Sequence, residues 1–231
     1  DEAFRALLDS EVRVWASRIL KHYGITLEVT GAPPDYPCLL LCNHQSAHDV
    51  PCIFAATPGS ISFMPKKEIR KLPFIGRLGD RAGYIWLDRQ NPTASKQAMD
   101  AAAAALKKRT FLIFPEGTRS GEGISGFKKG AFHVAIKAAG VRVVPVALAG
   151  ADDLASLDPQ RRLVRITFGT PIVVGGSESV DGLLTRVRKE VITLNLALGG
   201  RGAKPGTEEE HVALKGNPAR KGNAAAVWLK V

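Results

Sequence analysis

Two histidines and an aspartate stand close together in the heptapeptide NHQSAHD, residues 43–49, directly after the apolar run 38–42. His44 and His48 are four residues apart, a spacing that on a helix places both imidazoles on one face, where they can bind zinc. In the familiar helical zinc motif a glutamate general base follows the first histidine, and Gln45 stands there instead. We therefore predict that this segment does not form a metal site.

A second interpretation joins His44 to Asp49, which lies five residues further along the chain. On one continuous helix this spacing is a rotation of about 500°, so the two side chains can meet only if His44 precedes the helix and Asp49 lies in its first turn. A carboxylate bonded to one imidazole nitrogen fixes the tautomer and leaves the other nitrogen free as a base. The alternative is a polar cap, in which Asn43 or Ser46 caps the helix and Asp49 complements its dipole. The segment alone does not decide between the two.

A second polar segment, FPEGTRS at residues 114–120, also follows an apolar run. Its proline and glycine predict a tight turn that presents Glu116 and Arg119 at the same sheet edge as His44. An arginine among backbone amides suits a phosphate or a carboxylate. The alternative is a Glu–Arg pair that merely stabilises its own loop.

Further cations follow two other apolar runs. Arg89 ends the stretch GYIWLDR, and the segment MPKKEIRKLPFIG, residues 64–76, contributes Lys66 and Lys67 among its basic residues. Each group alone is usually a solvated charged surface. Together they indicate positive charge around a histidine base, which suits a phosphorylated substrate whose hydroxyl loses a proton to His44.

Two other phosphate and nucleophile motifs do not match. Gly121 and Gly126 have the spacing of a phosphate-binding loop, but Phe127 stands where that motif needs lysine. We interpret this stretch as a mobile glycine loop that carries Lys128 and Lys129. The sequence also has neither a Gly-x-Ser-x-Gly elbow nor a reactive-cysteine pattern, so we predict no covalent acyl-enzyme.

The elements that must position these residues alternate along the chain. This alternation predicts an α/β fold with a largely parallel central sheet covered by helices on both faces, and ligands of such sheets bind at the carboxyl ends of the strands. We predict an N-terminal amphipathic helix at 1–24, an α/β domain at 25–199 and a C-terminal tail at 200–231. The predicted strands are 38–42, 61–64, 84–87, 111–114, 141–148 and 163–168, and the predicted helices of the α/β domain are 47–56, 93–109, 128–139 and 178–198.

Charge and composition limit the classes of partner. The formal net charge is +10, and residues 60–146 hold 16 Lys and Arg against six Asp and Glu, so this stretch carries the whole excess. Aromatic residues are 6% of the chain and do not interleave with the basic ones, so we predict no nucleic-acid partner. An anionic membrane surface or a phosphorylated molecule fits better. The three cysteines are too few for a disulfide framework and favour a reducing cytoplasm, and no apolar run approaches the roughly 20 residues of a membrane span.

Four blocks in one order resemble the glycerolipid acyltransferase family, specifically the 1-acylglycerol-3-phosphate acyltransferases. Asn43, His44 and Asp49 match its first block, an Asn-His pair followed after four residues by Asp. The second block, a glycine, an apolar strand and a closing arginine, is matched at 83–89. Its third block, Phe-Pro-Glu-Gly-Thr-Arg, is matched at 114–119, and its fourth, Val-Pro-Val, at 144–146. The blocks span about residues 38–172.

The resemblance implies transfer of an acyl chain from acyl-coenzyme A or acyl-carrier protein to lysophosphatidic acid, by an enzyme attached peripherally to the cytoplasmic membrane face. We expect His44 to act as the base and Asp49 to orient it, with no metal and no cofactor. Glycerol-3-phosphate or another lysolipid is the alternative acceptor, and a non-catalytic membrane-binding protein is the alternative from another class. The substrate-binding residues that we predict are Lys67, Arg89, Glu116, Gly117, Thr118 and Arg119.

Overall fold

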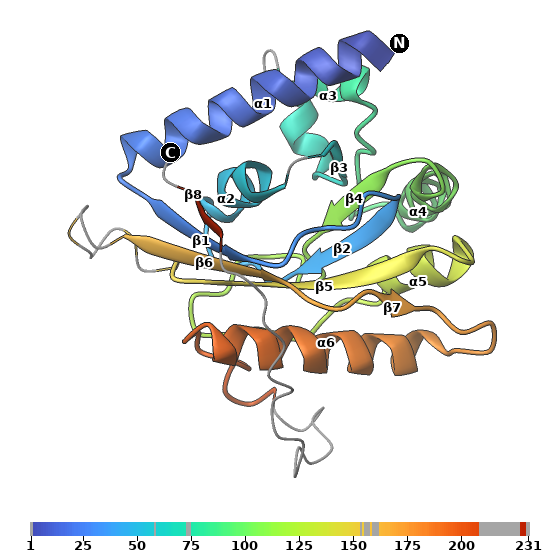
Figure 1. The fold of residues 1–231 in the computed structure, drawn as a ribbon. Helices are drawn as coiled ribbons and strands as arrows, with labels where there is room; N and C mark the ends of the chain where they lie inside the picture. Colours follow the sequence, from blue (N-terminus) through green and yellow to red (C-terminus); the bar gives the residue numbers. More distant parts are fainter. Residues whose placement is uncertain are drawn as a thin grey trace.

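A computed structural model describes residues 2–57, 59–72, 75–152, 154, 158, 162–207 and 227–229. One eight-stranded sheet runs through the molecule in the order β3-β4-β2-β5-β6-β1-β8, with β7 paired to β5 outside this order (Figure 1). Its strands are β1 (Thr26–Thr30), β2 (Cys38–Cys42), β3 (Ile61–Phe63), β4 (Thr110–Ile113), β5 (Arg142–Ala149), β6 (Leu163–Phe168), β7 (Ile172–Val173) and β8 (Val227–Leu229).

The sheet is mixed and mostly parallel. Strands β3, β4, β2 and β5 run parallel to one another, and β1 is parallel to β6. The antiparallel pairs are β5 with β6, β5 with β7, and β1 with β8. Every residue of β2 is buried, because helices cover both faces of this central strand, and this explains its continuous apolar sequence.

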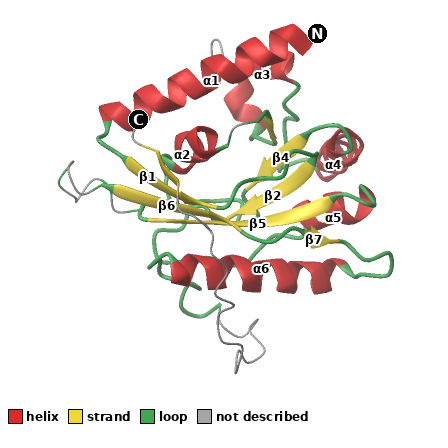
Figure 2. Cartoon of the chain, viewed as in Figure 1, coloured by secondary structure: helices red, strands yellow, loops and turns green. Residues whose placement is uncertain are grey.

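Helices lie on both faces of the sheet, as predicted (Figure 2). Two separate clusters of buried side chains form the core. On one face α1 and α2 pack through Leu20 and Ile53 against Leu40 of β2. On the other face α4, α5 and α6 pack against Leu39 and Leu41 of the same strand. The helices are α1 (Glu2–His22), α2 (Asp49–Ala56), α3 (Ile75–Ala82), α4 (Pro92–Leu106), α5 (Gly130–Lys137), α6 (Val180–Ala197) and the short 3₁₀ helix η1 (Lys67–Lys71).

The predicted strand at 84–87 is wrong. Leu87 makes one isolated parallel bridge with Lys66, and its amide donates to the carbonyl of Pro65 over 2.8 Å. Pro65 has no amide hydrogen to return to a partner strand, which interrupts a regular ladder at this edge of the sheet. The chain nevertheless runs beside β3, and Arg89 follows as expected.

Both ends of the chain contribute regular secondary structure. Helix α1 ends before Gly24, whose φ of 62° lies in the left-handed region that glycine adopts readily. Within the predicted tail, Val227–Leu229 forms β8 beside β1, and residues 200–207 are also described. The division of the chain at residues 24 and 199 stays a prediction. Among the helices that the structure describes, none combines the length and apolar character needed to cross a membrane.

Candidate active site

A histidine–aspartate pair lies between β2 and α2. His44 occupies the turn after β2, and Asp49 is the first residue of α2 and reaches back to it. Nδ1 of His44 lies 2.7 Å from Oδ2 of Asp49. His48, at the N-cap position of α2, makes no capping hydrogen bond through its side chain, while the Ser46 hydroxyl accepts the backbone amide of His48 over 3.2 Å. The geometry expected for a base and its orienting acid is therefore present.

The Asp49 carboxylate is fully buried and holds the whole turn together. The same Oδ2 accepts hydrogen bonds from the backbone amides of Gln45 and Ser46, over 2.7 and 2.9 Å. Because Nδ1 of His44 is committed to Asp49, the other ring nitrogen, Nε2, is left for chemistry. Backbone amides at the start of the helix after His44 could in principle stabilise an oxyanion. The amides of Gln45 and Ser46 do not serve this role, because both donate to Asp49.

Two neighbours fix the position of His44. The ring of Phe114 stacks on the imidazole, with centroids 4.0 Å apart and planes 16° apart. Asn43, which is buried, exchanges two hydrogen bonds of 2.9 Å with the backbone of Leu148 in β5. Asn43 thus anchors the turn to the centre of the sheet. In the sequence, the only sign of this role is that Asn43 directly precedes His44 in the Asn-His pair.

Glu116 lies behind His44 and does not belong to the cavity wall. Its Oε1 accepts the backbone amide of His44 over 2.7 Å, and its Oε2 accepts the amide and the hydroxyl of Ser125 over 2.8 and 2.7 Å. Burial raises the pKa of this carboxyl above its ordinary value, while the donors from His44 and Ser125 oppose that shift. Glu116 therefore links the histidine turn to the glycine loop, whereas the sequence analysis predicts it as a substrate-binding residue.

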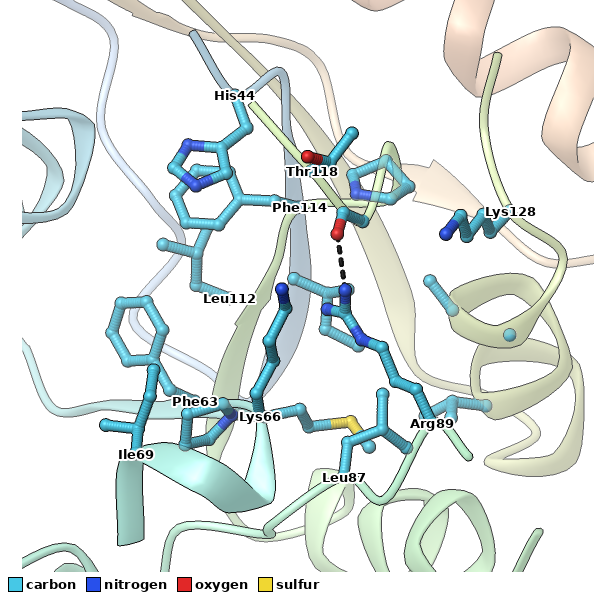
Figure 3. Close-up of a pocket in the computed structure, with 18 of the residues that line it drawn as sticks. His44, Phe63, Lys66, Ile69, Leu87, Arg89, Leu112, Phe114, Thr118 and Lys128 are labelled. Carbon is cyan, nitrogen blue, oxygen red and sulfur yellow. Dashed lines mark hydrogen bonds between the residues drawn. The ribbon is translucent and has the colours of Figure 1, made fainter. Parts of the chain in front are cut away.

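A cavity of about 710 Å³ opens beside His44 (Figure 3). Its wall is mainly apolar, with side chains such as Phe63, Ile69 and Leu112. Apart from His44, every charged side chain that the described residues contribute to this wall is a cation. These cations are Lys66, Arg89, Arg119 and Lys128. An anionic head group and an apolar chain therefore both find matching surfaces in one cavity.

The structure brings together five of the six predicted substrate-binding residues and separates the sixth. Arg89 donates a hydrogen bond to the carbonyl oxygen of Gly117, which joins the two cationic segments at the cavity. Lys67 instead pairs with Asp88, with Nζ 2.5 Å from Oδ2, and its neighbour Lys66 lines the cavity. The residues around or directly behind the cavity are thus Arg89, Glu116, Gly117, Thr118 and Arg119, together with Lys66 and Lys128, which the prediction omitted.

The two histidines of the heptapeptide have different surroundings. Nδ1 of His48 lies 3.1 Å from the Ser46 hydroxyl, and its ring meets Tyr23 edge to face at 4.6 Å. His44 faces Asp49 and Phe114 instead. Within the described ranges, no group of three or more His, Cys, Asp or Glu side chains is arranged to hold a metal ion.

The sequence and the fold match known proteins over most of the chain. The acyltransferase family model matches residues 26–149, and the chain is 31% identical over 202 residues to human 1-acyl-sn-glycerol-3-phosphate acyltransferase alpha. That match covers 80% of this chain and 71% of the human protein. The chain belongs to the acyltransferase family.

Two further members of the family extend the comparison. Lyso-ornithine lipid O-acyltransferase of Pseudomonas aeruginosa is 30% identical over 204 residues, which cover 80% of this acyltransferase and 77% of that protein. The crystal structure of the 1-acyl-sn-glycerophosphate acyltransferase PlsC from Thermotoga maritima superimposes with a TM-score of 0.72 at 26% identity. The superposition covers 87% of this chain and 83% of the other. The predicted acyltransferase-like α/β fold is confirmed.

The thiols of this acyltransferase are expected to be inert. Cys38, Cys42 and Cys52 are all buried, and burial raises the pKa of each thiol. Since the thiolate is the reactive form, iodoacetamide at mildly alkaline pH should neither label the native enzyme nor lower its activity. Intact-protein mass and initial rate measure this together. Labelling that removes activity in proportion would instead indicate a thiol that takes part in catalysis.

Proposed function

We propose that this acyltransferase moves a fatty acyl chain from an acyl thioester to the free hydroxyl of lysophosphatidic acid and so forms phosphatidic acid. The observation that carries the proposal is the His44–Asp49 pair, held at 2.7 Å beside a cavity that combines cations with an apolar wall. A lysophosphatidic acid has the same two characters, because it joins a phosphate to an acyl chain.

The proposed reaction is a direct transfer. Nε2 of His44 takes the proton of the acceptor hydroxyl while the hydroxyl oxygen attacks the thioester carbonyl. The tetrahedral intermediate then collapses, the carbon–sulfur bond breaks, and the departing thiolate takes the proton from the imidazolium. Asp49 keeps the imidazole in the required tautomer and stabilises its charged form. Because a thioester is already activated, this route needs neither a metal nor a cofactor.

The cations of the cavity are assigned to the acceptor phosphate. Arg119 and Arg89 offer planar groups that can bind phosphate oxygens in pairs, and Lys66 and Lys128 add point charges. Thr118 and Gly117 also line the cavity. The apolar wall is assigned to acyl chains, and acyl-coenzyme A or acyl-carrier protein serves as donor. The basic excess at 60–146 supports peripheral attachment to an anionic membrane surface, at its cytoplasmic face.

The acceptor is tested with a panel, because one relative carries the name of a lyso-ornithine lipid acyltransferase. With a single acyl thioester as donor, we expect lysophosphatidic acid to give the highest kcat/KM, above glycerol-3-phosphate and lyso-ornithine lipid. The physical reason is that the cavity has an apolar wall, which glycerol-3-phosphate leaves empty, and several cations, which suit a phosphate. A clear preference for lyso-ornithine lipid would overturn the proposed acceptor.

Adjacent lysines provide a matched test of phosphate binding. Lys66 lines the cavity, whereas Lys67 is held by Asp88. We expect Lys66→Gln to raise KM for lysophosphatidic acid about 10-fold, the size of a lost charge-assisted hydrogen bond, with a smaller effect on kcat. Lys67→Gln should change KM less than about threefold, because exposed ion pairs contribute little. The reverse order would restore Lys67 as the phosphate ligand.

A further inference from the structure

Arg188, in the middle of α6, is a fully buried cation outside the cavity. Its side chain is 1% exposed and reaches two segments far from it in sequence. Nε donates to the carbonyl of Ser125 over 3.3 Å, and Nη2 donates to the hydroxyl and carbonyl of Thr207 over 2.9 and 3.3 Å. Burying a guanidinium raises the free energy of the folded state unless such bonds compensate for the lost water. A buried arginine at this position therefore needs an explanation in terms of structure or function.

The segment that follows α6 pairs with the glycine loop at the same place. The amide of Ile124 donates to the carbonyl of Gly202 over 2.8 Å, and the amide of Lys204 donates to the carbonyl of Ile124 over 2.9 Å. Gly123, at φ 119°, permits this approach, because a Cβ there would lie 3.0 Å from the backbone of both partners. Residues 201–207 therefore form a strap that packs along the glycine loop. Arg188 donates hydrogen bonds to both the strap and the loop.

The strapped loop leads directly to the catalytic turn. Ser125 gives both its amide and its hydroxyl to Oε2 of Glu116, and Oε1 of Glu116 accepts the backbone amide of His44. Hydrogen bonds thus connect Arg188 to His44 through Ser125 and Glu116. None of the three residues on this path before His44 lines the cavity.

A second path runs from the strap to the same turn. Asn195 of α6, also fully buried, accepts the amide of Gly202 over 2.9 Å and donates to the carbonyl of Leu148 over 2.8 Å. That same carbonyl accepts a hydrogen bond from Asn43, the residue before His44. The strap therefore reaches His44 from both sides, through Glu116 and through Asn43.

We propose that Arg188 and the strap, residues 201–207, are positioning elements of catalysis that hold His44 in place. Arg188 acts through Ser125 and Glu116, and the strap acts in addition through Asn195 and Asn43. The role rests on the proposed function in that it takes His44 as the catalytic base. A base displaced by about 1 Å can lose about 100-fold in rate, so contacts this far from the cavity can control turnover. Arg188 and Ser125 touch no substrate in this account and act through Glu116.

The test compares two arginines of the same helix. Arg188→Lys keeps the charge but cannot bond Ser125 and Thr207 together, whereas Arg186 is exposed and bonds Glu178, so Arg186→Lys is the control. We expect Arg188→Lys to lower kcat about 10-fold or more with KM for the acceptor nearly unchanged, and Arg186→Lys to leave both at wild-type values. The acceptor is whichever lysolipid the wild type uses best.

A double variant separates positioning from general loss of stability. If Arg188 acts through Glu116, Arg188→Lys combined with Glu116→Gln loses about as much as the more damaging single change, whereas independent effects multiply. Multiplying losses, or a normal kcat in folded Arg188→Lys, would overturn the proposal. If Arg188→Lys fails to fold, Ser125→Ala takes its place in the same cycle, since it removes one of the donors to Glu116.

Hydrogen exchange gives a readout that does not depend on the acceptor. In Arg188→Lys, amides at 43–49 and 116–126 should exchange faster than in the wild type, while those of β6 should not. Uniformly faster exchange would mean simple destabilisation and would contradict the inference. A wild type without transfer to lysophosphatidic acid would refute the proposed acceptor and leave this exchange pattern unaffected.

Discussion

Replacing His44 by alanine should lower kcat by about 10²-fold to 10⁴-fold, the range for loss of a general base. Nδ1 of His44 is held by Asp49 at 2.7 Å, and its ring lines the cavity, so alanine leaves the acceptor hydroxyl without a proton acceptor. KM for lysophosphatidic acid should change little, because the phosphate is assigned to other side chains. Initial rates of product formation across acceptor concentrations measure both parameters.

His48 supplies the control for this change. It lies four residues away in the same turn but contacts Tyr23 and Ser46, and it does not line the cavity. His48→Ala should therefore keep kcat within about threefold of the wild type, since it removes no group that reaches the substrate. Equal losses in the two variants, or a nearly active His44→Ala enzyme, would contradict the assignment of His44 as base.

Asp49→Asn should lower kcat by about 10²-fold to 10⁴-fold while the turn keeps its geometry. All three hydrogen bonds that the carboxylate accepts end on Oδ2, and the buried Oδ1 has no hydrogen-bond partner among the described residues. An asparagine can thus keep its oxygen in the place of Oδ2 and put its amide group in the place of Oδ1. The substitution removes the negative charge that stabilises the imidazolium but leaves an acceptor for all three hydrogen bonds.

Stability and rate distinguish this effect from misfolding. The side-chain amide that Asp49→Asn introduces costs about 1–3 kcal/mol when it is buried without a partner, so the melting temperature should fall modestly. Asp49→Ala removes the acceptor for His44, Gln45 and Ser46 at once and should destabilise more. A well-folded Asp49→Asn enzyme with nearly normal kcat would show that charge at this position is not needed.

Local geometry limits how His44 and Asp49 can meet, and the resemblance to the acyltransferase family then favours the pair over a polar cap. A spacing of five residues is incompatible with one helical face, and an apolar strand followed by a helix places His44 in the turn between them. The alternating elements predict the sheet and its two helical faces for the same reason. The sequence cannot predict which of Lys66 and Lys67 faces the cavity, because the two residues are adjacent and of the same type. Their directions are set by the way the chain enters η1 after Pro65.

The contacts that span the sequence could not be predicted in this way. From its place in the motif, Glu116 is predicted to bind substrate. Its burial behind His44 depends on hydrogen bonds from Ser125, which lies in a loop without regular secondary structure. In the sequence, nothing distinguishes Arg188 from the other basic residues of the predicted helix at 178–198. Its burial becomes apparent only when residues 201–207 fold back on the glycine loop, and the composition of that segment is typical of a tail.

The most direct test of acyl transfer by His44 is the ratio of products formed by the purified wild type from an acyl thioester and lysophosphatidic acid. Mass spectrometry would measure phosphatidic acid, and a thiol reagent would measure the released thiol in the same reaction. We predict one phosphatidic acid for each thiol released, with no acylated protein at any time and with both products lost in His44→Ala. Thiol release that yields free fatty acid, or an acyl group covalently attached to the enzyme, would contradict direct transfer to the lipid hydroxyl.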